Sequence, residues 1–170
     1  MQDVDLFLSL AGIAGVFVGF GALISIRGGS TSDTYEVTYV GMVVWLGVQV
    51  VVASLAPVVI SRFDVTGHAL WMACSVIFLV LFWPGDEALK RVSTERRAVL
   101  AATPKKSRVT YELLAVPLWL PANIALVLIL LGVFPGRELA LYLAAVVLIL
   151  LMDCLILLFL VNQIGRPATT

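Results

Sequence analysis

Charge is scarce in this sequence, and residues that usually carry chemistry are scarcer still. Charged residues make up 13% of the 170 positions, about half the share in an ordinary soluble domain. The net charge is zero, so no overall field points to nucleic acid as a partner. There is one histidine, and the two cysteines, Cys74 and Cys154, lie inside apolar runs. Neither a zinc site nor a disulfide framework is therefore expected.

Catalytic motifs are missing as well. The sequence contains no His-Glu-x-x-His spacing, no Gly-x-Ser-x-Gly turn, no Walker loop and no dinucleotide-binding fingerprint. No two acids occur together inside an apolar run. We therefore expect a protein that is not an enzyme and that binds no metal and no cofactor.

Long apolar runs are what the sequence has in abundance. Hydrophobic residues make up 61% of the chain, and a helix needs about 20 of them to cross a bilayer. Because backbone polar groups must be satisfied internally in lipid, even the valine-rich second run favours helix. The sequence predicts an all-α, multi-pass membrane bundle with one domain over residues 1–170 and five transmembrane helices. The predicted spans are residues 6–26, 37–60, 67–83, 113–134 and 139–164.

The third run is short, which leaves an alternative of four spans plus a re-entrant segment. Basic residues concentrate on the cytoplasmic side of membrane proteins. Five spans with the N-terminus outside and the C-terminus in the cytoplasm put nine basic residues inside and two outside, and the alternative gives the same division. We favour five spans in a cell membrane, because a non-helical dip exposed to lipid is rarely tolerated. The layout is similar to that of many small bacterial inner-membrane proteins.

One acid interrupts the last run. Asp153 lies well inside the predicted span, where an ionised carboxylate costs about 2.5–3.5 kcal/mol even on the mildest scale. Counted from the cytoplasmic ends at about 1.5 Å per residue, Asp153, Gln49 and Asn123 lie about 16–18 Å deep, level with Gly15. We expect these three side chains to form an intramembrane polar layer. An alternative is that the two amides only hold helices together.

Small residues recur at helical spacing in the first run, at Gly12, Gly15, Gly19 and Ala22. Such a face lets helices approach closely in lipid. It predicts packing within one protomer, a seam between copies, or the lining of a pore.

The polar segment of residues 84–110 carries most of the basic residues. Lys105, Lys106 and Arg108 form its last basic cluster and are predicted to contact anionic lipid or a cytosolic partner, unless they act only as a topology signal.

Two functions follow from these observations. The first is a homo-oligomeric channel or transporter for a small cation or a proton, with Asp153 as the site and Gln49 and Asn123 as neutral ligands. The second is a non-conducting membrane scaffold or sensor that acts through its basic loop.

Overall fold

Helices make up nearly all of the residues that the structure describes. The computed structural model describes the backbone of residues 4–27, 34–91 and 105–164, and side chains within 4–24, 40–81 and 117–158 together with 83 and 161. No strand occurs in these ranges, so the all-α prediction is confirmed. The elements are α1 (Val4–Arg27), α2 (Thr34–Ile60), the 3-10 helix η1 (Ser61–Phe63), α3 (Gly67–Arg91), α5 (Lys105–Leu130) and α6 (Glu138–Ile164).

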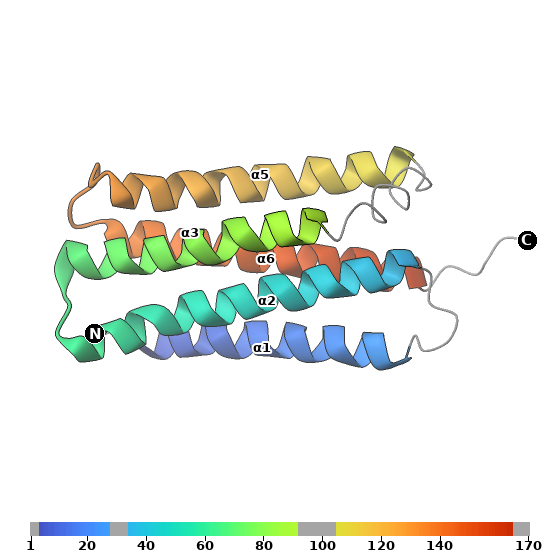
Figure 1. Ribbon diagram of the computed structural model, residues 1–170, viewed down its shortest axis with the longest axis horizontal. Coiled ribbons are helices and arrows are strands. Elements are labelled where there is room, and N and C mark those ends of the chain that lie inside the picture. The colour runs from blue at the N-terminus through green and yellow to red at the C-terminus, as the bar shows by residue number, and fades with distance from the viewer. Residues whose placement is uncertain (1–3, 28–33, 92–104, 165–170) are drawn as a thin grey trace, which may run out of the picture.

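The five α-helices run side by side along the long axis of the molecule and alternate in direction (Figure 1). In this view α1 and α5 lie at opposite edges, with α2, α3 and α6 between them. α6 packs against each of the other four α-helices. The most apolar helix is thus the one around which the bundle is organised, as expected for a helix that is hydrophobic on every side.

Some helices extend beyond the apolar runs that predicted them. α3 continues through Pro84 to Arg91, and α5 begins at Lys105, so helix occupies both ends of the segment predicted as a polar loop at 84–110. The middle of that segment lies outside the described residues. By length and composition, three helical stretches are able to cross a membrane, namely Val4–Ile24, Val40–Phe63 and Glu138–Leu158. The apolar parts of the other two helices are shorter, at Gly67–Leu81 and Pro117–Leu130.

α5 ends four residues before the predicted end of its span, and glycine explains why. Gly132 has φ +63°, a left-handed conformation that glycine adopts without steric cost. Its N–H donates to the Ile129 carbonyl at 3.0 Å, and the Val133 N–H donates to the Leu128 carbonyl at 3.2 Å. This pair of bonds is a Schellman motif, which satisfies the last carbonyls of the helix and stops it.

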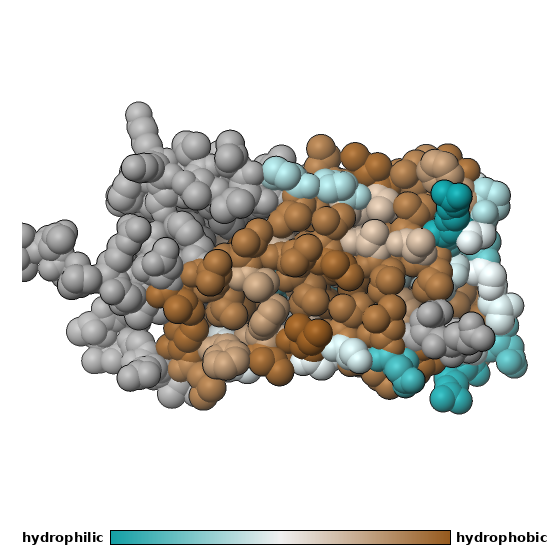
Figure 2. Space-filling view, turned by 180° about the vertical axis from the view of Figure 1, so that it is seen from behind, coloured by the Kyte–Doolittle hydropathy of each residue, from teal (hydrophilic) through white to brown (hydrophobic). Residues whose placement is uncertain are grey.

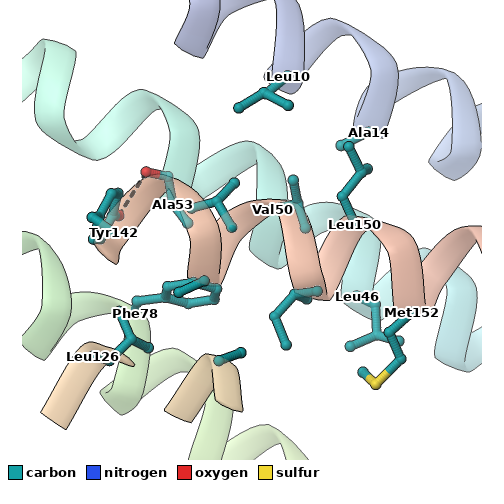
Figure 3. Packing of buried hydrophobic residues seen from close by; sticks show 14 of the residues in the cluster. Leu10, Ala14, Leu46, Val50, Ala53, Phe78, Leu126, Tyr142, Leu150 and Met152 are labelled. Atoms are coloured by element: carbon teal, nitrogen blue, oxygen red, sulfur yellow. Dashed lines mark hydrogen bonds between the residues drawn. The ribbon is translucent and has the colours of Figure 1, made fainter. Parts of the chain in front are cut away.

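The core is apolar and is centred on α6. Figure 3 shows side chains from the neighbouring helices pointing toward it, among them Leu10 and Ala14 of α1, Val50 of α2 and Phe78 of α3. The outer surface is apolar too: large exposed residues include Val16, Phe20, Leu131, Leu151 and Leu158.

In Figure 2 apolar residues cover most of the coloured part of the face in view, and the most polar side chains gather at one end. The exposed polar residues of that end include Arg62, Asp64, His68 and Arg137, near the turns from α2 to α3 and from α5 to α6.

Candidate functional site

Asp153 lies in the second half of α6 and is completely buried, with 0% of its surface exposed. Neither of its carboxyl oxygens has a hydrogen-bond partner. Most buried polar atoms in proteins do have a partner, and leaving a charged group without one costs more than leaving a neutral one. Asp153 is therefore a buried acid that no described residue of the chain satisfies.

The residue directly opposite Asp153 is Gly47 of α2. A Cβ atom built on Gly47 would lie 3.3 Å from Asp153 Oδ2 and 3.3 Å from the carbonyl oxygen of Ala14 in α1. It would also lie only 2.5 Å from Val18 Cγ2, so Gly47 allows α1 and α2 to approach closely at this level. The carboxyl group thus points into the junction of α1, α2 and α6, toward the inside of the protomer.

Gln49 is buried on the same helix as Gly47 but is held elsewhere. Its Nε2 donates to the Leu81 carbonyl of α3 at 3.3 Å, while its Oε1 has no partner. Asn123 is half-buried, and its Nδ2 donates at 2.9 Å to the Trp119 carbonyl of its own helix, one turn earlier. The hydrogen bonds of the two amides thus lead to α3 and α5, and neither reaches Asp153. The Gln49 bond joins two helices, whereas the Asn123 bond stays within α5.

The small-residue face of α1 points outward. Gly12, Gly15 and Gly19 are exposed, and a Cβ added to any of them would meet nothing within 4 Å. Ala22 is exposed as well. Inside this protomer the face is unpartnered, and the glycine opposite Asp153 is Gly47 rather than Gly15.

Two further buried polar groups of this region were not singled out as site residues from the sequence. Ser54 of α2 and Ser75 of α3 are fully buried, and neither hydroxyl oxygen has a partner. Nothing in the sequence distinguishes them from serines that bond to their own helix backbone, as Ser9 does with the Asp5 carbonyl at 2.7 Å.

Tyr142 is a second buried polar residue of α6. Unlike Asp153, it was not singled out from the sequence. Its hydroxyl donates to the Ala53 carbonyl of α2 at 2.7 Å (Figure 3). Its ring contacts Phe7 of α1 and two aromatic residues of α3, Trp71 and Phe78, with centroid distances of 5.5–6.3 Å. Such aromatic packing is stabilising, so Tyr142 ties four helices together.

At the polar end, His68 of α3 meets the first residue of α6. His68 Nδ1 lies 3.4 Å from Glu138 Oε1, with 43% of the histidine side chain exposed. Glu138 is buried, but the exposed histidine leaves the pair open to water, so we expect the pair to contribute little to stability.

The other site predictions remain untested. The side chains of Lys105, Lys106 and Arg108 lie outside the described residues. Among the side chains that are described, no group of three His, Cys, Asp or Glu residues is placed to hold a metal ion.

Comparison with known proteins finds no relative of this chain. No protein-family model matches the chain, and searches of curated proteins and of solved structures find no match either. The function is therefore argued from the site alone.

Proposed function

We propose that this protein is a five-span membrane protein that moves a small cation or a proton across the bilayer by way of Asp153. The observation that carries the proposal is the state of that side chain: it is fully buried and both of its oxygens are unpartnered. Acids inside membrane helices usually mark ion or proton pathways. A carboxyl needed only for packing would be expected to have a donor.

The five-span arrangement is supported by α3. α3 is one continuous helix of 25 residues, about 37 Å long at 1.5 Å per residue. Its apolar part, Gly67–Leu81, covers about 22 Å of that length. α3 lies along the bundle and does not turn back on itself (Figure 1), which favours a span over a re-entrant segment. The N-terminus is then outside and the C-terminus in the cytoplasm, according to the distribution of basic residues.

The orientation of Asp153 favours a pathway within each protomer. Its carboxyl group faces Gly47 and the Ala14 carbonyl, at the junction of α1, α2 and α6, and the exposed glycines of α1 are on another side of that helix. In this proposal Gln49 positions α2 against α3, because its amide donates to the Leu81 carbonyl, and Asn123 bonds within its own helix.

The open face of α1 supports a homo-oligomer. Gly12, Gly15 and Gly19 have no neighbour in the protomer, and small residues at this spacing bring helices together in lipid. We expect Gly15→Leu to reduce chemical cross-linking between copies in membranes, while Leu158→Ala, on an exposed part of α6, leaves cross-linking unchanged. Equal cross-linking of both variants would contradict this part of the proposal.

A flux assay tests the function. Purified protein in liposomes is exposed in turn to proton, sodium, potassium and chloride gradients. We expect flux of one cation or of protons in the wild type and background flux in Asp153→Asn, a change of similar size and shape. Tyr142→Phe is the matched control, because it removes a buried polar group from the same helix. Absence of flux for every ion would overturn the proposal and leave a membrane scaffold as the alternative.

A further inference from the structure

A carboxyl oxygen and a backbone carbonyl oxygen both lie next to Gly47. Asp153 Oδ2 and the Ala14 carbonyl oxygen each lie 3.3 Å from the position that a Cβ at Gly47 would occupy. Their separation is therefore no larger than the sum of these two distances. Any side chain at position 47 would place its first carbon 3.3 Å from both oxygens, and only glycine leaves that position open.

The number of available ligands distinguishes a proton from a metal ion. Hard cations are held by several oxygen atoms at once, as in calcium sites and potassium filters. Here the nearby amide of Gln49 is bonded toward α3, and the described residues offer no cluster of acids. A protonated carboxyl, in contrast, needs one acceptor for its O–H. The Ala14 carbonyl is such an acceptor.

We propose that the species bound at Asp153 is a proton, that the carboxyl group, unpartnered in this structure, donates to the Ala14 carbonyl once it is protonated, and that Gly47 is the positioning residue. This inference rests on the proposed function and deepens it. It identifies the transported species as a proton and assigns a role to α1, whose backbone closes the site.

Among the described side chains of the helices packed around the site, no other charged group competes for this role. The acid and base of α1, Asp5 and Arg27, stand near its two ends, and α2 has no charged residue between 40 and 60. On α6 the ionisable groups are Glu138 at the start, Tyr142, which is bonded to the Ala53 carbonyl, and the exposed thiol of Cys154.

The described parts of α3 and α5 contain few ionisable side chains. The described side chains of α3 contribute His68 at the polar end and the Cys74 thiol, and residues 117–130 of α5 contribute no ionisable side chain.

Infrared difference spectroscopy tests this directly. A protonated carboxyl has a C=O stretching band that a carboxylate lacks. The band present in reconstituted wild type at neutral pH and absent from Asp153→Asn reports the protonated acid. We expect such a band, unchanged by added sodium or potassium. Its absence, or its loss when either cation is added, would overturn the inference.

The role of Gly47 needs a second variant, because a methyl group there collides with Val18. The double variant Gly47→Ala with Val18→Ala removes that collision and keeps a methyl group 3.3 Å from each of the two oxygens. We expect its Asp153 band to shift to higher frequency, as for an acid that has lost its acceptor, and its proton flux to fall. Gly41→Ala, where an added Cβ meets nothing within 4 Å, is the control and should match the wild type.

A folded double variant with an unshifted band and normal flux would contradict the role of Gly47. If the double variant does not fold, the response of the wild-type band to sodium and potassium decides alone. Flux of sodium or potassium that depends on Asp153, together with a band lost on adding that ion, refutes the proton and leaves the proposed function intact. A stable band without flux of any ion refutes the proposed function and leaves a proton-binding site.

Discussion

Tyr142 and Asp153 lie about three helical turns apart on α6. They differ in whether their polar groups have a hydrogen-bond partner. Both are fully buried. The tyrosine hydroxyl donates to a carbonyl of α2 at 2.7 Å, whereas both oxygens of Asp153 are without a partner. One helix therefore carries a polar group that the fold satisfies and another that it does not. The first is explained by stability, and the second is the feature for which a function has to be proposed.

The largest effect on stability is expected at the satisfied residue. Tyr142→Ala removes a buried ring that contacts three other aromatic residues, and such truncations cost about 3–5 kcal/mol. Tyr142→Phe removes only the hydrogen bond, worth about 0.5–1.5 kcal/mol. Denaturant unfolding in detergent measures both. If the two variants lost the same amount, the ring cluster would not be the anchor described here.

Asp153→Ala should give the opposite result. The change removes an unpartnered buried carboxyl, which costs about 1–3 kcal/mol or more when left unsatisfied, at the expense of a few packing atoms. We expect the free energy of unfolding to rise or to stay within about 1 kcal/mol of the wild type. A fall of about 3–5 kcal/mol, as for a broken buried ion pair, would reveal a partner for Asp153 and remove the contrast with Tyr142.

Gln49 is intermediate between these two residues, since one end of its amide is bonded and the other is not. Bonds between membrane helices contribute about 0.6 kcal/mol on average. Gln49→Leu should therefore change the unfolding free energy by less than about 1 kcal/mol and leave proton flux close to that of the wild type. Loss of flux in a variant that stays folded would show that Gln49 takes part in transport, as the polar layer predicted from the sequence implies.

The smallest effect is expected at the polar end. His68 is half-exposed and pairs with Glu138 at 3.4 Å, so water and salt screen the attraction. His68→Ala should lower the melting temperature slightly at low ionic strength and not at all in high salt. A decrease that persists in high salt would mean that the ring, and not the charge, holds the end of α3.

The sequence predicts the fold well because composition and apolar length determine it. Five helices and the absence of strands in the described residues follow from long uncharged runs, even where valine dominates α2. Helix ends are harder to predict, because they depend on local geometry. The Schellman motif at Gly132 ends α5 before Phe134, and α3 continues past Pro84.

The candidate site was predictable only in part. A lone acid in an apolar run identifies Asp153, because its burial is costly wherever it points. The depth of a residue can be counted from the sequence, but its direction around the helix depends on how the helices pack. Gly15 and Gly47 show this, since both are glycines in apolar helices, and only Gly47 faces the acid.

The most direct test of the central claim compares transport by equal amounts of folded wild-type and Asp153→Asn protein in the same liposomes. We predict that an imposed pH gradient dissipates through the wild type and persists in vesicles with the variant, although both proteins unfold at similar temperatures. Equal dissipation by the two proteins would show that the buried carboxyl takes no part in transport.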